Sequence, residues 1–127
     1  MYSVQSNHIR TYQDLKYWQT AFQTISLIIK LVQKQPWSKS LDSIVNQLIR
    51  SSGSIGANIA EGYGRYTGKE YQHFLQIALG SATETEHWLL VMTEFAPKYK
   101  DQFGIIIDLN QQTIRMLYST LRTLHNK

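Results

Sequence analysis

The chain has 127 residues, of which 43% are hydrophobic, so it can form a packed domain and is not a disordered tail. It contains no Cys, which excludes disulfide frameworks and thiolate zinc sites, and no apolar run approaches the ~20 residues that a membrane span requires. Its formal net charge of +4 permits a nucleic-acid partner without requiring one.

The N-terminal residues differ from the rest of the chain. Residues 1–10 lack a basic segment followed by an apolar stretch, so they do not form a secretion signal. We expect them to form a flexible arm in front of a single domain at residues 11–127. Together with the absence of Cys, this predicts a cytoplasmic protein with no membrane contact.

Four long segments carry apolar or small residues at steps of three and four, the spacing of the buried seam of a helical bundle. The predicted seams are Leu15, Trp18, Phe22, Ile25, Ile29 and Val32; Leu41, Val45, Leu48, Ser52, Ile55 and Ile59; Tyr71, Leu75, Ala78, Ala82, Thr85, Leu89 and Met92; and Ile107, Asn110, Ile114, Leu117, Leu121 and Leu124. No stretch alternates with a period of two, which predicts no sheet. Short connections favour an all-α, antiparallel up-down-up-down four-helix bundle.

The boundaries of these segments carry their own signals. Thr11–Asp14 and Thr67–Glu70 both read as capping boxes, which predicts helix starts there. Pro36 and Pro97 separate helices. Small residues, Gly53, Gly56, Gly62 and Gly80 among them, recur where a simple bundle would place Leu or Ile, so we expect two helix backbones to approach closely.

Apolar residues also lie outside the predicted seams. They are Tyr17, Ile28 and Leu31 near the first seam, and Leu79, Trp88, Leu90 and Val91 outside the third. A wide apolar face on a long helix requires burial, so we expect the protein to associate with itself.

Three motifs resemble catalytic or metal sites without meeting their requirements. Ser52–Gly56 resembles a nucleophile elbow but lies inside a helical pattern. Gly62–Glu70 has the wrong spacing for a phosphate loop. Glu84–His87 has the spacing Glu-x-x-His, whereas a di-iron bundle needs this motif on each of two helices together with a Glu from each remaining helix. The sequence therefore predicts no catalytic site, no cofactor and no metal.

A polar cluster is predicted between the second and third helices. Its members are Asn58, Glu61, Ser81 and Glu84, with Arg50 and Arg65 as partners of the carboxylates. A buried carboxylate is costly unless it is hydrogen-bonded, so the favoured interpretation is a network that fixes helix register or a subunit contact. The alternative is a small-molecule site with Glu61 as general base.

The charges favour a basic surface on two helices. No acidic residue occurs between Lys16 and Lys39, and none follows Asp108. The candidate phosphate-binding residues are Lys16, Lys30, Lys34, Arg115 and Arg122. A merely solvated polar face is the alternative, and repetition of the face around an oligomer would strengthen binding.

Four motifs of the sequence are shared with a known family. They are Asp14-Leu15-x-x-Trp18-Gln19, Gln47-Leu48-x-Arg50, Ser54-Ile55-x-x-Asn58-Ile59-Ala60-Glu61-Gly62-Tyr63-Gly64-Arg65 and Phe74-Leu75-x-x-Ala78-x-Gly80-Ser81-x-x-Glu84. With these motifs the sequence resembles the bacterial four-helix bundle proteins called 23S rRNA intervening sequence proteins. Tyr17 stands where the family usually has Val, and the fourth helix matches only at Met116-Leu117.

The resemblance implies a homopentameric ring and no established catalytic activity. It also implies kinship with the accessory variability determinant proteins of diversity-generating retroelements, which are basic pentamers that partner a reverse transcriptase and bind nucleic acid. The first hypothesis is therefore a non-enzymatic oligomer that binds RNA or DNA, with a reverse transcriptase as a candidate partner. The alternatives are a protein-binding scaffold without nucleic-acid affinity and an enzyme that uses Asn58, Glu61 and Glu84.

Overall fold

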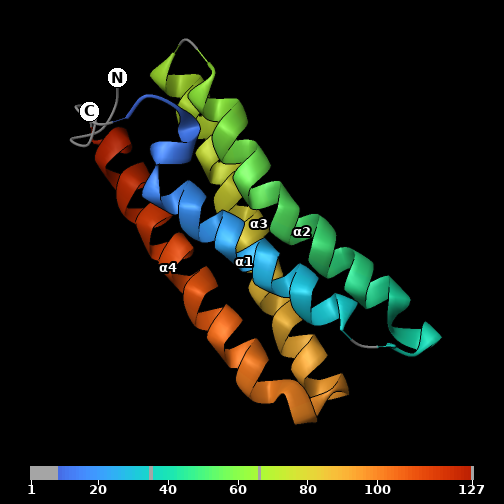
Figure 1. Cartoon of the computed structure of the whole chain (residues 1–127). Coiled ribbons are helices and arrows are strands. Elements are labelled where there is room, and N and C mark those ends of the chain that lie inside the picture. Colours follow the sequence, from blue (N-terminus) through green and yellow to red (C-terminus); the bar gives the residue numbers. More distant parts are fainter. Residues whose placement is uncertain (1–8, 35, 66, 127) are drawn as a thin grey trace.

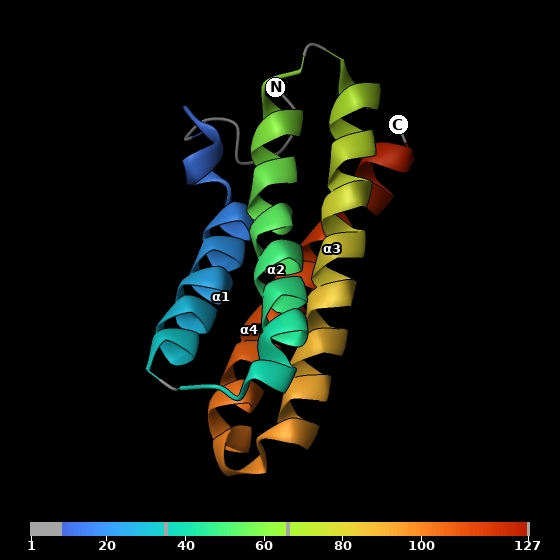
Figure 2. The same ribbon diagram turned by 90° about the vertical axis from the view of Figure 1, so that its right-hand side faces the viewer.

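The computed structural model describes residues 9–34, 36–65 and 67–126, and in it four α-helices pack around one core (Figure 1). They are α1 (Lys16–Gln33), α2 (Asp42–Tyr63), α3 (Gly68–Phe95) and α4 (Lys100–His125). Each helix contacts the next one along the chain, and α4 closes the bundle against α1, as the rotated view in Figure 2 also shows. The predicted all-α, up-down-up-down bundle is confirmed, and the described residues form no strand.

The helix starts follow from local hydrogen bonds. The Thr67 hydroxyl accepts from the Glu70 amide at 3.0 Å, so α3 begins where the sequence predicts it. The capping box at Thr11–Asp14 also forms, but it caps a short 3-10 turn, and α1 begins only after the extended residue Leu15. Residues 1–8 of the expected N-terminal arm lie outside the described residues, whereas Ile9 packs against the core.

The predicted seams of α2 and α3 are confirmed, since every residue assigned to them is buried. Ile55 and Ile59, whose exposure would have contradicted the bundle, are fully buried. The seam of α4 is confirmed at Asn110 and Leu117. The other buried residues of α4 are Phe103, Ile106 and Thr113, so its core face is rotated relative to the prediction.

The predicted seam of α1 is confirmed at Leu15 but wrong at Phe22 and Ile29. The buried residues are Tyr17, Ala21, Thr24 and Ile28, together with Leu15 just before the helix. Phe22 and Ile29, which the prediction placed inside, are 55% and 38% exposed. The small side chains of Ala21 and Thr24 allow α1 to approach the core closely, and this leaves the larger residues on the flank of the helix. None of the four helices, as far as they are described, is long and apolar enough to cross a membrane.

The flank of α1 that faces α2 explains two of the glycines. A Cβ on Gly56 would lie 3.2 Å from Trp18 Nε1, and a Cβ on Gly53 would lie 3.2 Å from Ile25 Cδ1. Both contacts are tighter than ordinary packing, so the glycines make room for large side chains of α1. The expected close approach of the two middle helices is found at Gly62, where a Cβ would lie 2.8 Å from Phe74 Cβ and 3.4 Å from the Tyr71 carbonyl oxygen, whereas a Cβ on Gly80 would meet nothing within 4 Å.

A layer of uncharged polar side chains divides the core at mid-length. Its members, all at most 1% exposed, are Thr24, Ser51, Ser52, Thr85, Asn110 and Thr113. One apolar cluster, which includes Ile59 and Leu75, lies on one side of this polar layer, and a second cluster, which includes Leu48 and Phe103, lies on the other. All four helices contribute to the layer, so the apolar core consists of two parts.

Candidate functional site

The outward face of α1 carries three exposed lysines. Lys16 and Lys30 lie within the helix and Lys34 follows its last residue, on the side away from the buried seam. The exposed amide side chains on this face are Gln19, Gln23 and Gln33, and α1 contains no acidic residue. A helix face with cations, amides and no carboxylate suits contact with phosphates.

The outward face of α4 carries a second, smaller set of cations. Arg115 and Arg122 are exposed, and they lie seven residues apart and so share one side of the helix. Tyr118, which is 59% exposed, lies between them. No acidic residue follows Asp108 on this helix.

The five candidate cations differ from the other two arginines that the sequence singles out. In the part of the chain that the structure describes, none of the five forms an ion pair, whereas Arg50 and Arg65 are each paired with a carboxylate. An exposed cation without a protein counter-charge is available to an anionic ligand. The structure therefore separates the candidate phosphate contacts from the arginines that serve the bundle itself.

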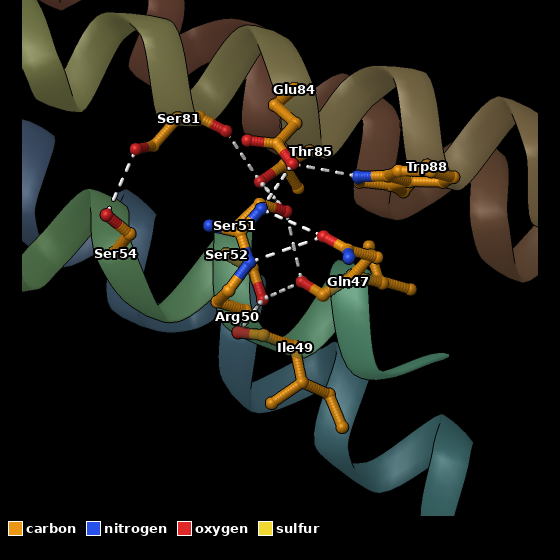
Figure 3. A network of polar contacts seen from close by, with 11 residues as sticks. Gln47, Ile49, Arg50, Ser51, Ser52, Ser54, Ser81, Glu84, Thr85 and Trp88 are labelled. Atoms are coloured by element: carbon orange, nitrogen blue, oxygen red, sulfur yellow. Dashed lines mark hydrogen bonds and ion pairs between the residues drawn. The ribbon is translucent and has the colours of Figure 1, made fainter. Parts of the chain in front are cut away.

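Three polar contacts form a ladder between α2 and α3 (Figure 3). The Ser81 hydroxyl donates to Ser54 Oγ at 3.1 Å, and the Thr85 hydroxyl donates to Ser51 Oγ at 3.0 Å. Arg50 donates to the Glu84 carboxylate at 2.6 Å. Ser81 meets Ser54, and Thr85, about one turn later on α3, meets Ser51, about one turn earlier on α2, so the ladder fixes the alignment of two antiparallel helices.

The charged end of the ladder lies near the surface. The Arg50 side chain is 59% exposed and that of Glu84 is 36% exposed. Glu84 also accepts from Trp88 Nε1 at 3.0 Å, and Arg50 also donates to the Gln47 side chain at 2.9 Å. An ion pair with this exposure contributes little to stability, about 0–1 kcal/mol.

The structure does not bring the six residues of the predicted polar cluster into one group. Asn58 donates to Ser54 Oγ at 2.9 Å, and Ser54 in turn links it to Ser81. Glu61 lies further along α2 and pairs with Arg65, four residues away on the exposed surface. Arg65 also lies 3.6 Å from Glu70. The two carboxylates of the cluster, Glu61 on α2 and Glu84 on α3, therefore have separate arginine partners.

The described residues offer little to a metal ion, since no group of three or more His, Cys, Asp or Glu side chains lies together among them. The two Glu-x-x-His pairs of the sequence, Glu70–His73 and Glu84–His87, both lie on α3. Glu84 is engaged by Arg50 and Trp88, and the ring of His87 meets the ring of Trp88 edge to face.

A depression on the outward face of α1 was not predicted from the sequence. It measures about 290 Å³, and its lining residues are Phe22, Gln23, Ser26, Leu27, Lys30 and Leu109. A second depression of about 220 Å³ shares Leu27 and Lys30 and extends to Lys34 and Ile105. The small residues Ala21 and Thr24 are the signal in the sequence that could have placed Phe22 outside the core.

Comparison with known protein families gives one assignment. Residues 13–119 match the family described as 23S rRNA-intervening sequence protein. The chain belongs to this family. The match covers all of α1, α2 and α3 and most of α4.

A similar solved structure, from the S23 ribosomal protein family, agrees with the assignment. It is the crystal structure at 1.70 Å of a protein with unknown function from the S23 ribosomal protein family of Bacteroides thetaiotaomicron VPI-5482. That protein is 26% identical to this chain, with a TM-score of 0.72 over 83% of this chain and 97% of the other. Comparison with curated proteins gives no match.

Proposed function

We propose that this member of the 23S rRNA-intervening sequence family is a non-enzymatic, oligomeric protein that binds nucleic acid through the outward faces of α1 and α4. The observation that carries the proposal is the set of five exposed cations without an ion-pair partner in the described structure: Lys16, Lys30, Lys34, Arg115 and Arg122. Lysine and arginine on such faces attract phosphates independently of base sequence.

Exposed apolar side chains support the oligomeric part of the proposal. They are Leu90 and Phe95 on α3, each more than half exposed in the single chain and outside the basic faces of α1 and α4. Association of several copies would bury part of this surface and repeat the basic faces around the assembly. Light scattering at micromolar concentration should show a mass above 14.8 kDa, and a species of only that mass would contradict self-association.

Binding is tested by the anisotropy of labelled RNA and DNA oligonucleotides at several salt concentrations. We expect the affinity of the wild-type protein to fall steeply with salt, because each phosphate contact releases counterions. The double variant Lys30→Glu/Arg115→Glu should lower the affinity by at least about tenfold, since it reverses one charge on each basic face.

A charge-matched control separates the two faces from net charge alone. Lys39→Glu/Lys69→Glu changes the net charge equally, and both of its lysines are exposed but lie on neither face. We expect this control to retain most of the affinity. An equal loss in the two double variants would remove the assignment to the faces, and no binding by the wild-type protein would overturn the proposed function.

A further inference from the structure

Phe22 presents an aromatic ring to solvent beside a lysine. The ring is 55% exposed although Phe is normally buried in a core. It stacks on Trp18, with ring centroids 5.0 Å apart and planes inclined by 17°. Trp18 is itself held by the edge of Tyr12, at 5.2 Å, and lies against Gly56. The Phe22 ring is therefore supported from below by a fixed neighbour.

Ser26 opens the space next to this ring. It is small, and Phe22 lies one helical turn before it and Lys30 one turn after it, so that the three border the depression of about 290 Å³. Gln23, Leu27 and Leu109 complete the wall. One depression thus combines an aromatic ring, an ammonium group, and an amide and a hydroxyl that can hydrogen-bond.

The depression continues along the groove between α1 and α4. The neighbouring depression of about 220 Å³ shares Leu27 and Lys30 and adds Lys34 and Ile105, which is 63% exposed. None of the residues that line the two depressions is acidic. Lys30 and Lys34 are one helical turn apart, so cations accompany the apolar surface along its length.

This combination favours one form of nucleic acid. A duplex presents its phosphates to a flat basic face and keeps the faces of its bases stacked inside. Its bases therefore do not contact an exposed aromatic ring or an aliphatic groove on the protein. A single strand offers bases that stack on aromatic side chains while a cationic groove follows its backbone. An unpaired strand can therefore use the apolar and the cationic surfaces of α1 together, whereas a duplex can use only the cationic surface.

We propose that the outward face of α1 binds single-stranded nucleic acid, with a base against Phe22 and neighbouring phosphates at Lys30 and Lys34. The inference rests on the proposed function and specifies its ligand. Gln23 and Ser26 lie where they can hydrogen-bond to the edge of the base or to the sugar.

The test compares a labelled single-stranded 12-nucleotide RNA of mixed sequence with the corresponding 12-base-pair duplex, by anisotropy at several salt concentrations. The wild-type protein should bind the single strand at least about fivefold more tightly, which corresponds to the stacking of one base. The Phe22→Leu variant keeps an apolar side chain on the surface. It should lose about five- to tenfold in affinity for the single strand, with an unchanged salt dependence and unchanged affinity for the duplex.

Two further variants show whether the ring and the lysine act as described. Lys30→Gln should lower the slope of log affinity against log salt for the single strand by about 0.7, because one phosphate contact is lost. Ile29→Ala is the control for Phe22, since Ile29 is also exposed on α1, at 38%, but does not line either depression. It should leave both affinities unchanged.

The outcomes distinguish this inference from the proposed function. If the wild-type protein binds neither RNA, both fail. If it binds the duplex as tightly as the single strand, or if Phe22→Leu changes neither affinity or both equally, the inference fails and the proposed function stands. Light scattering on Phe22→Leu identifies one further result: a changed oligomer mass with unchanged affinity would place the ring in a subunit contact. Displacement of the RNA by an acidic, amphipathic peptide at equal concentration would overturn the inference in favour of a protein ligand.

Discussion

Asn110 on α4 donates from Nδ2 to the backbone carbonyl of Ala82 on α3 at 2.8 Å, in the middle of the core. Asn110 is fully buried, and its Oδ1 atom has no hydrogen-bond partner in the described structure. A buried polar atom without a partner costs about 1–3 kcal/mol, more than one ordinary hydrogen bond returns. The polar layer therefore contains one residue whose side chain is only partly satisfied.

We expect Asn110→Leu to raise the free energy of unfolding by up to about 2 kcal/mol, because it removes the unpaired oxygen at similar volume and has a higher helix propensity. Urea unfolding followed by circular dichroism measures the change. A large loss of stability would show that Oδ1 is satisfied in solution, for example by a buried water.

Thr85→Val is the matched substitution elsewhere in the polar layer. The Thr85 hydroxyl lies 3.0 Å from Ser51 Oγ and 2.8 Å from the Ser81 carbonyl oxygen, so it is fully used. Its replacement by an isosteric methyl group should lower the free energy of unfolding by about 1 kcal/mol, in the opposite direction to Asn110→Leu. Urea unfolding of both variants shows whether the two changes in the free energy of unfolding have opposite signs.

Gly62 is the glycine at which an added side chain would make the closest contact. A Cβ at this buried position would lie 2.8 Å from Phe74 Cβ and 3.3 Å from the Tyr71 ring, so α2 and α3 would have to move apart. We expect Gly62→Ala to lower the free energy of unfolding by about 1–3 kcal/mol, measured as a lower urea midpoint.

Gly80 is the natural control for that substitution. It lies in the middle of α3, is exposed, and would place a Cβ in open space. In the single chain Gly80→Ala should raise the free energy of unfolding by about 0.5–1 kcal/mol, because Ala favours the helix over Gly. Loss of stability in the oligomer instead would show that a second subunit packs against this position.

Tyr17 makes stability depend on pH in the alkaline range. Burial raises the pKa of Tyr17 above its ordinary value of 10.0, although the hydrogen bond with the Tyr71 hydroxyl acts in the opposite direction. The unfolded chain therefore releases this proton at lower pH than the folded protein does. The contribution of Tyr17 is present in full below the unfolded pKa and is lost as the pH rises above it.

Tyr17→Phe isolates this effect from the other groups that titrate in base. We expect the difference in the free energy of unfolding between the wild-type protein and Tyr17→Phe to be constant below about pH 9. Between about pH 10 and 11 the wild-type protein should lose stability relative to Tyr17→Phe. Urea unfolding at each pH gives the difference. A difference that stays constant up to about pH 11 would contradict the raised pKa.

The sequence was sufficient for the fold and for the seams of α2 and α3, because their buried residues follow one unbroken spacing. On α1 two sets of residues share that spacing, one through Phe22 and Ile29 and one through Ala21 and Thr24. Hydrophobicity alone favours the larger side chains. The rotation is decided by tertiary contacts instead, among them the Tyr17–Tyr71 hydrogen bond and the fit of Trp18 over Gly56.

Part of the candidate site could likewise be predicted from the sequence and part could not. The cations of α1 and α4 could be predicted because charge and spacing along one helix place them on one face. The depression beside Phe22 could not, since it requires the correct rotation of α1 and also includes Leu109, which is distant in sequence. Arg50 and Glu84 are likewise far apart in sequence, and their pairing follows only from the alignment of α2 and α3.

The ladder between α2 and α3 has a consequence for the order in which the molecule opens. These two helices make the most extensive contact in the bundle and are held by hydrogen bonds at successive turns, whereas Ala21 and Thr24 give α1 a shallow buried face. Amide protons of α1 should therefore exchange with solvent before those of the central hairpin. The helix that carries Lys16 and Lys30 is thus the one that can loosen, and adapt to a ligand, with the least disruption of the rest of the fold.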